Sequence, residues 1–156
     1  MGFRNTMDLK TPTVRFVKTH QDARLPKAND ESKGIGDSGY DLYAVQRVKL
    51  WPGIAREVPV GLTLGYVEPG YWIRVEARSG LSFKHQVLPH NGVLDNGYRG
   101  DLGVLLYNHG DHIHIVEKGD RIAQLVIYPL IQPVVEWALE VDETSRGSKG
   151  LGSSGK

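Results

Sequence analysis

Residues 92–104 gather the residue types that a hydrolytic site needs. Asp95 supplies a carboxylate that can take a proton from a water molecule, and Tyr98 supplies a ring that can pack against a base or a sugar. Glycines let a flat ligand approach the backbone closely, where amides and carbonyls can read its edge. Gly92, Gly100 and Gly103 are placed to serve in this way. The same residues would also suit an ordinary β-hairpin.

The pair Asn96-Gly97 predicts a tight turn within this segment. It is the preferred pair for a two-residue type I′ hairpin, in which both residues adopt positive φ. Because strand-like residues lie on both sides, we expect a hairpin that sets Asp95 and Tyr98 opposite each other.

Two other segments carry groups that bind anions. RSGLS begins with Arg78, Ser79 and Gly80 after a predicted strand, and amides at a helix start beside an arginine form an anion-binding nest. GDRIAQL, residues 119–125, contains Gln124, whose amide can donate to a phosphate oxygen. The plain alternatives are a serine helix cap with a surface arginine, and a polar entry to a β-strand.

The C-terminal residues 144–156 are rich in glycine and serine, with Leu151 as the single large apolar residue. Such a segment cannot hold a fold by burial. Arg146 and Lys149 give it the charge to wrap a polyphosphate and become ordered on it. A plain disordered tail is the alternative.

Histidines offer a second kind of chemistry. His112 and His114 would share one face of a strand, with His109 close by, which is a partial set of metal ligands. Further ligands are not evident in the spacing, so a structural or solvent-exposed role is the favoured interpretation.

Composition limits the class of protein. The 156 residues, 17.3 kDa, suit one domain. With 19 Lys and Arg against 18 Asp and Glu, the net charge of +1 gives no overall field for nucleic acid or an anionic membrane. The absence of cysteine excludes disulfides, thiol catalysis and cysteine zinc sites.

The longest apolar runs, residues 104–107 and 125–131, fall far short of the roughly 20 residues of a membrane span. The polar N-terminus shows no apolar signal-peptide region. We therefore expect a cytoplasmic protein, with the nucleus or the cytosol of a virus-infected cell as alternatives.

The 19 glycines and 8 prolines divide the chain into short segments rich in β-branched and aromatic residues, which predicts an all-β sandwich or barrel. One short helix is expected at Ser79–His85, opened by a serine cap. The predicted strands are Val14–Lys18, Tyr40–Ala44, Val48–Leu50, Ala55–Pro59, Leu62–Tyr66, Tyr71–Ala77, Gly103–Asn108, Ile113–Val116, Ile122–Tyr128 and Val134–Val141.

Taken in order, five segments resemble the five motifs of the trimeric dUTP diphosphatase (dUTPase) family. They are DSGYDLYA (residues 37–44), RSGLS (78–82), GVLDNGYRGDLGV (92–104), GDRIAQL (119–125) and RGSKGLGSSG (146–155). The resemblance implies a jelly-roll-like, distorted β-barrel with three active sites shared between the subunits of a homotrimer. It also implies a single barrel domain over residues 1–143 and a flexible C-terminal arm over residues 144–156.

The resemblance assigns roles position by position. Asp95 matches the catalytic aspartate that activates the water attacking the α-phosphorus of dUTP, giving dUMP and pyrophosphate. Tyr98 matches the aromatic residue that packs against deoxyribose, and Asp41 matches a supporting aspartate of the first motif. Matches to uracil-binding positions are Asn91, Gly92 and Gly103, with Leu151 of the arm matching the position that covers the base. Matches to phosphate-binding positions are Arg78, Ser79, Gly80, Gln124, Arg146, Gly152, Ser153 and Ser154.

The cofactor implied is Mg²⁺, held by the phosphates and water without a direct protein ligand. The role implied is to keep uracil out of DNA and to supply dUMP for dTTP synthesis. One departure is Leu151, which stands where the family usually has phenylalanine, so that apolar cover replaces ring stacking over uracil.

Two rival functions are considered. The fold-related dCTP deaminases have a catalytic glutamate near the third motif, whereas this chain has no glutamate between Glu76 and Glu117, which argues against deamination. A binding module gated by dUTP is the other rival, because a tail that becomes ordered on a ligand can control a protein partner.

Overall fold

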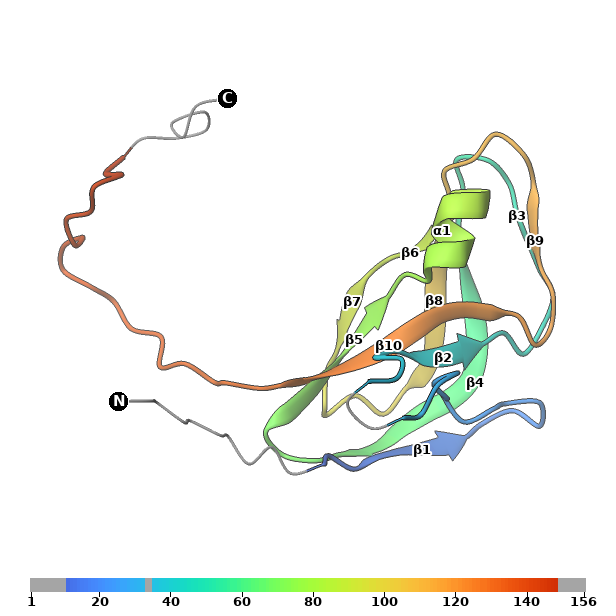
Figure 1. Ribbon diagram of the computed structural model, residues 1–156, viewed down its shortest axis with the longest axis horizontal. Helices are drawn as coiled ribbons and strands as arrows, with labels where there is room; N and C mark the ends of the chain where they lie inside the picture. The colour runs from blue at the N-terminus through green and yellow to red at the C-terminus, as the bar shows by residue number, and fades with distance from the viewer. Residues whose placement is uncertain (1–10, 33–34, 149–156) are drawn as a thin grey trace.

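A computed structural model describes residues 11–32 and 35–148 of the chain (Figure 1). Over these residues the structure is all-β apart from one short helix, as predicted. In chain order the elements are β1 (Val14–Lys18), β2 (Tyr40–Tyr43), β3 (Val48–Leu50), β4 (Ala55–Val67), β5 (Tyr71–Glu76), α1 (Ser79–His85), β6 (Val87–Pro89), β7 (Gly92–Leu94), β8 (Asp101–Asn108), β9 (His114–Val116) and β10 (Arg121–Pro129).

The strands form two four-stranded sheets and one small ribbon, and all of their pairs are antiparallel. Sheet A has the order β1-β4-β8-β6, and sheet B has the order β2-β10-β5-β7. The ribbon pairs β3 with β9. This arrangement is the jelly-roll-like architecture expected.

The core lies between the two sheets. Side chains of β8 alternate strictly between exposed and buried, so that Leu102, Val104 and Leu106 point inward. They meet apolar side chains of sheet B, including the fully buried Ile73 and the nearly buried Leu125. Burial of these side chains is what holds the sheets together.

Asn108, the last residue of β8, has a polar side chain with no exposed surface. Its amide nitrogen donates to the carbonyls of Leu50 and His112, at 3.0 and 2.8 Å, and its oxygen accepts from the Gly110 amide at 2.9 Å. Because all of these polar atoms are paired, Asn108 stabilises the end of the strand.

Two predicted strands, Ala55–Pro59 and Leu62–Tyr66, are one continuous strand, β4. Its pairing with β8 shifts between Pro59 and Thr63, and Gly61 lies there with φ +67°. A bulge accommodates a proline, which has no N–H to donate, and a glycine at positive φ. The strand is therefore bent at this point and not interrupted.

The strand predicted at Val134–Val141 was wrong. The last strand of sheet B ends at Pro129, and residues 130–148 carry no helix or strand. Val134, Val135, Trp137, Leu139 and Val141 are nearly or fully exposed. In Figure 1 this segment, orange to red, leaves the sheets and extends away from them. An isolated extended segment gains no ladder hydrogen bonds, so the strand-like composition alone was insufficient.

Helix α1 was predicted correctly in position and wrongly in its cap. Its N-cap is Arg78, with extended φ and ψ and no side-chain cap hydrogen bond, and Ser79 is the first helical residue. Ser82 instead donates its hydroxyl hydrogen to the Arg78 carbonyl at 3.0 Å. Among the described residues, no helix is long and apolar enough to cross a membrane.

The turn at Asn96-Gly97 is present, but the hairpin was wrong. Its strands belong to different sheets, because β7 pairs with β5 and β8 pairs with β4 and β6. Neither Asn96 nor Gly97 has positive φ, so the turn is not type I′. It carries the chain from sheet B to sheet A.

Candidate active site

The turn after β7 is held in place by bonds to the backbone. The Tyr98 amide donates to the Asp95 carbonyl at 2.9 Å, which closes the turn. The Asn96 side-chain amide donates to the Tyr71 carbonyl at 2.7 Å and so ties the turn to the start of β5. Arg99 donates to two carbonyls of its own turn, those of Asn96 and Tyr98, at 2.7 and 2.8 Å. The position of Asp95 is therefore fixed before any ligand arrives.

A cavity of about 270 Å³ lies between β7 and β8. Its lining is mostly apolar, and Tyr98, Asp101, His90 and Glu57 supply the polar side chains. Such a small, mostly apolar cavity with a few polar groups suits one planar ring. The remaining lining residues are Leu42, Val75, Gly92, Val93, Leu94, Leu102, Gly103, Val104, Leu105 and Leu125.

One wall of the cavity presents free backbone groups. β7 is the edge strand of sheet B, and β6 covers β8 only from Leu106 to Asn108. The His90 amide donates to the Leu105 carbonyl at 2.7 Å, so Leu105 turns its polar groups to the edge away from β4. Because successive residues alternate between edges, Gly103 directs its N–H and C=O to that same edge, toward the cavity.

Gly92, Gly100 and Gly103 differ in the space that surrounds them. A side-chain carbon built on Gly92 would meet no atom closer than 4.0 Å. One built on Gly100 would overlap the Tyr98 ring, and one on Gly103 would overlap the Glu57 carboxylate. Only Gly92 thus leaves room for an incoming ligand, while the other two accommodate side chains of the protein itself.

Asp95 lies at the end of β7 with its side chain exposed. Tyr98, three residues later, is 46% exposed and forms part of the cavity wall. Asp95 and Tyr98 thus share one short turn, of which Tyr98 lines the cavity and Asp95 does not. Asn91 precedes β7 and is exposed, and it does not line the cavity.

The second group of predicted residues is organised by Asp41 of β2. Its carboxylate is 4% exposed and accepts from Arg78 Nε at 2.6 Å. Arg121 NH1 lies 3.4 Å from the other carboxylate oxygen and donates to Asn29 Oδ1 at 2.7 Å. Paired charges of this kind fix the direction of a guanidinium. Asp41 therefore positions Arg78 at the start of α1.

Gln124 lies nearby, on β10. Its amide nitrogen donates to the Ala77 carbonyl at 2.8 Å, immediately before Arg78. A side-chain carbon on Gly39 would overlap the Gln124 side chain, so this glycine makes room for the amide. Gly80 has open space around it. A shallow cavity of about 320 Å³ beside α1 includes Arg78, Gly80 and Arg121 in its lining.

The two groups of residues lie at opposite ends of β5. Leu94, which precedes Asp95, pairs with Ile73 near the start of β5, and Arg78 follows the end of that strand. At about 3.3 Å per residue, the distance between Asp95 and Arg78 is about 20 Å. In Figure 1, α1 lies at one end of the sheets and the turn after β7 toward the other. One protomer therefore does not bring Asp95 together with the residues predicted to bind phosphate.

Of the predicted residues in the C-terminal arm, the structure describes only Arg146, which is exposed. Leu151, Gly152, Ser153 and Ser154 lie outside the described residues, as does Lys149.

The side chains of the three histidines considered as metal ligands do not point to one common position. His109 lies against the Tyr107 ring at 4.2 Å between centroids, and His112 contacts Asp111 outside β9. His114 contacts His85 instead, at 4.8 Å between centroids. Burial and the neighbouring His85 lower the pKa of His114, against the opposing effect of Asp120. In the described part of the chain, no three His, Asp or Glu side chains converge to hold a metal.

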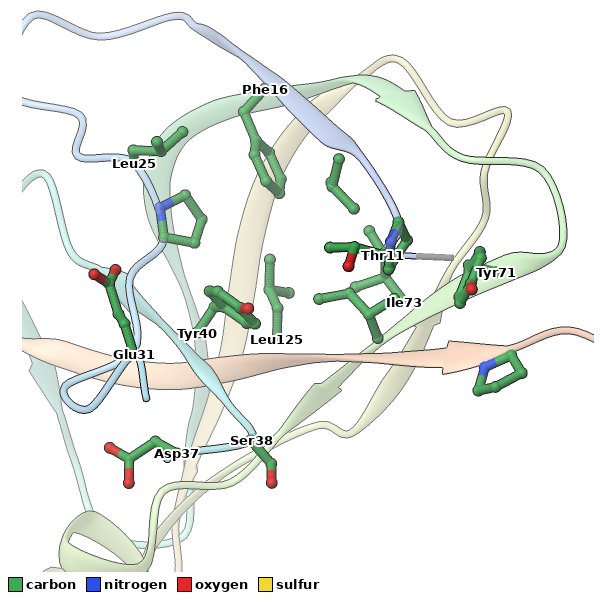
Figure 2. Close-up of a pocket in the computed structure, with 15 residues that line it drawn as sticks. Thr11, Phe16, Leu25, Glu31, Asp37, Ser38, Tyr40, Tyr71, Ile73 and Leu125 are labelled. Atoms are coloured by element: carbon green, nitrogen blue, oxygen red, sulfur yellow. The ribbon is translucent and has the colours of Figure 1, made fainter. Parts of the chain in front are cut away.

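A larger cavity, about 800 Å³, lies elsewhere (Figure 2). Phe16 of β1 faces Ile73 and Leu125 of sheet B across it, and the carboxylates of Glu31 and Asp37 lie at its margin. Its lining is mainly apolar, and it contains none of the residues predicted to bind a nucleotide.

Sequence reasoning missed Glu57, His90 and Arg121. Arg121 stands inside the GDRIAQL segment, so its motif could have pointed to it. Glu57 and His90 reach the cavity only because β4 and β6 flank β8, which no local pattern shows.

Comparison with known proteins agrees with this arrangement. A family model described as dUTPase matches residues 16–155. Deoxyuridine 5′-triphosphate nucleotidohydrolases of Helicobacter pylori (strain P12) and Solibacter usitatus are 41% and 43% identical over 144 and 148 residues. These alignments cover 91% and 92% of this chain and 96% of each relative.

Solved structures show the same fold. A variant dUTPase of Staphylococcus bacteriophage 80alpha with dUpNHpp has a TM-score of 0.79 and 28% identity, covering 92% of this chain and 99% of that one. The dUTPase from phage phi11 of S. aureus has a TM-score of 0.74 at 23% identity, covering 85% and 99%, and shows the fold alone. With its motifs, fold and relatives in agreement, the chain belongs to the dUTPase family, whose members hydrolyse dUTP.

Proposed function

We propose that this protein hydrolyses dUTP to dUMP and pyrophosphate, with Asp95 as the general base. The Asp95 carboxylate accepts a proton from a water molecule whose oxygen attacks the α-phosphorus. The bond between the α-phosphorus and the oxygen bridging to the β-phosphate breaks, and pyrophosphate leaves with the electron pair. The proton on Asp95 then returns to solvent.

The observation that carries this proposal is the cavity between β7 and β8, with Asp95 held on the same turn as Tyr98, which lines it. Uracil enters the cavity and pairs with the free backbone edge at Gly103, with Gly92 leaving it room. The narrow walls exclude the methyl group of thymine. Tyr98 then packs against deoxyribose and leaves no space for a 2′-hydroxyl group.

The phosphates bind to Arg78, Ser79, Gly80 and Gln124. Asp41 and the Ala77 carbonyl hold the Arg78 and Gln124 side chains in place, which lowers the entropy cost of binding. Mg²⁺ fits as a cofactor that is carried in with the substrate, because hard phosphate oxygens and water complete its coordination. When bound, it neutralises phosphate charge.

The active site is shared between the subunits of a homotrimer in this proposal. The separation of about 20 Å between Asp95 and Arg78 within one protomer supports it, because both must contact one triphosphate. The fully exposed Trp137 and Leu139 support it as well, since large apolar side chains in water favour association.

The arm closes over the bound nucleotide. Arg146, Gly152, Ser153 and Ser154 contact the γ-phosphate, and Leu151 covers the base with an apolar side chain. Hydrolysis removes dUTP before it can be built into DNA and supplies dUMP for dTTP synthesis.

The test is an assay of pyrophosphate release from dUTP, dTTP, dCTP and UTP with Mg²⁺. We expect cleavage of dUTP alone, and a fall in kcat of at least about 100-fold for Asp95→Asn. Cleavage of all four nucleotides would show that the cavity does not read the base. Full activity of Asp95→Asn would remove this residue from the mechanism.

A second candidate function is control of a protein partner by dUTP. It is favoured by the similar phage dUTPases, which are described as controlling transfer of virulence genes by a G protein-like mechanism. A pull-down from host extract with and without dUpNHpp tests it. Recovery of a protein in only one of the two conditions would support this function, and identical recoveries would contradict it.

A further inference from the structure

We propose that Gly100 is a positioning residue for Tyr98, and through it for selection of the sugar. A side-chain carbon built on Gly100 would overlap the hydroxyl oxygen of Tyr98 and lie 2.6 and 3.0 Å from two of its ring carbons. The shorter of these distances is one that real side-chain carbons essentially never show, and the longer is a very tight contact. The Tyr98 ring thus occupies the space that every other residue at position 100 would need.

The backbone of Gly100 cannot give way. The Thr63 hydroxyl lies 2.6 Å from the Gly100 carbonyl and 2.9 Å from that of Arg99. Thr63 belongs to the long strand β4 and is paired with Asp101 of β8. The one hydrogen of this hydroxyl is shared between the two carbonyls, and it ties the backbone at position 100 to sheet A.

The Tyr98 side chain is the part that can move. It is 46% exposed, and its hydroxyl group makes one long hydrogen bond, 3.2 Å, to the Asp101 carbonyl. A methyl group at position 100 would push the ring toward solvent without opening the core. The fold should survive, while the wall of the cavity beside Tyr98 would be lost.

The consequence rests on the proposed function, in which Tyr98 packs against deoxyribose. If the ring leaves the wall, the substrate loses an apolar contact, and a 2′-hydroxyl group gains room. Asp95 keeps its own backbone bonds to the turn, so chemistry on bound substrate should change less than binding.

The experiment compares Gly100→Ala with Gly97→Ala, a control on the same turn where an added carbon meets nothing within 4 Å. Binding of dUpNHpp is measured by calorimetry, and kcat and KM are measured for dUTP and UTP. For Gly100→Ala we expect binding of dUpNHpp about tenfold weaker and preference for dUTP over UTP about tenfold lower. We expect a change in kcat of about threefold at most, and neither effect for Gly97→Ala.

A double-mutant cycle tests whether Gly100 acts through Tyr98. In the Tyr98→Ala background, Gly100→Ala should cause no further loss of dUpNHpp binding. An equal loss in both backgrounds would overturn the proposal, because the glycine would then act through its own backbone.

A measurement without nucleotide separates this proposal from the proposed function. In the NMR spectrum, cross-peaks between the Tyr98 ring protons and the α-protons of residue 100 should be strong in the unaltered protein and lost in Gly100→Ala. If the Tyr98 ring moves in Gly100→Ala but no form of the protein, the unaltered one included, binds dUpNHpp, the proposed function fails. If the ring stays, the positioning role fails.

Discussion

At the scale of single residues, Asp41 is a buried carboxylate that needs positively charged partners. Its side chain is 5% exposed and faces two arginines, Arg78 and Arg121, from different elements. A buried carboxylate must be paired, because its charge has lost the solvation of water. The pairing serves the site, since Arg78 gains a fixed direction at the start of α1.

Replacing Asp41 by Asn should therefore lower both stability and phosphate binding. We expect the free energy of unfolding to fall by about 2 kcal/mol, because two partly buried arginines lose their counter-charge. The control is Asp22→Asn, which removes an exposed ion pair with Lys118 at 3.2 Å and should cost less than about 1 kcal/mol. Urea unfolding measures the free energy of unfolding of both variants, and equal losses of stability would contradict the role given to Asp41.

Gln124 offers a second test at this scale, through Gly39. A methyl group at position 39 would overlap the Gln124 amide and displace it from the Ala77 carbonyl. Gly39→Ala should raise KM for dUTP by about tenfold, with kcat changed less, because a binding contact is lost. Steady-state kinetics with dUTP checks this, and an unchanged KM would show that Gln124 does not contact the substrate.

Residue identities were predictable where a motif is continuous in sequence. Asp95 and Tyr98 share one turn, so their proximity follows from three residues of chain. Glu57 reaches the same cavity from a strand some forty positions earlier, through the pairing of β4 with β8. No local pattern encodes that pairing, and the sequence alone could not have found it.

At the scale of elements, α1 and β9 meet through two imidazoles. His85 is the last residue of α1, and His114 is the first residue of β9. Lys84, Asp120, Arg78 and Arg121 are the other charged groups in the lining of the cavity beside them. This contact joins the helix that carries the phosphate-binding residues to the ribbon of β3 and β9.

The contact should make stability depend on pH. The pKa of His114 is lowered in the folded state, first by burial and then by His85, from its usual 6.5. As pH falls below 6.5, the unfolded chain takes up a proton at this residue before the folded protein does. The free energy of unfolding should therefore decrease with falling pH, until the pH is below the lowered pKa.

His114→Gln should reduce this dependence, and His112→Gln, on an exposed side chain, should leave it unchanged. Urea unfolding at a series of pH values on both sides of 6.5 gives the slopes. The same slope in His114→Gln and in the unaltered protein would assign the dependence to another group.

The sequence predicted most elements because each short apolar run ends at a glycine, a proline or a polar turn. It failed where the state of a segment depends on distant partners. β4 continues through Val60 and Gly61 because β8 supports both of its halves. Val134–Val141 has the composition of a strand and, in the protomer, no strand beside it. Composition indicates that a segment can form a strand, and the presence of a neighbouring strand decides whether it does.

At the scale of the whole molecule, the main feature is that Asp95 and Arg78 stand at opposite ends of β5. A strand is too stiff to bring its ends together, so no bending of one protomer can unite these residues. Two or more copies related by symmetry can do so, because Asp95 of one copy can then face Arg78 of another. The extended, apolar segment after Pro129 gives the copies a surface through which to associate.

This arrangement predicts that two inactive variants restore activity when they are mixed. In Asp95→Asn every subunit lacks the general base, and in Arg78→Ala every subunit lacks the phosphate contact. If one site takes Asp95 from one subunit and Arg78 from another, random co-assembly gives about a quarter of sites with both residues intact. If both came from the same chain, no mixed assembly would hold an intact site.

Co-expression of the two variants with different tags, followed by purification through both tags, supplies the mixed assemblies. In a trimer that holds both variants, one of the three sites has both residues intact. The rate of dUTP hydrolysis should therefore be well above that of either variant alone and about a third of that of the unaltered protein. Simply combining the two purified variants, without exchange of subunits, is the control and should give no gain. A mixed assembly as inactive as its parents would place Asp95 and Arg78 in different reactions or in no shared site.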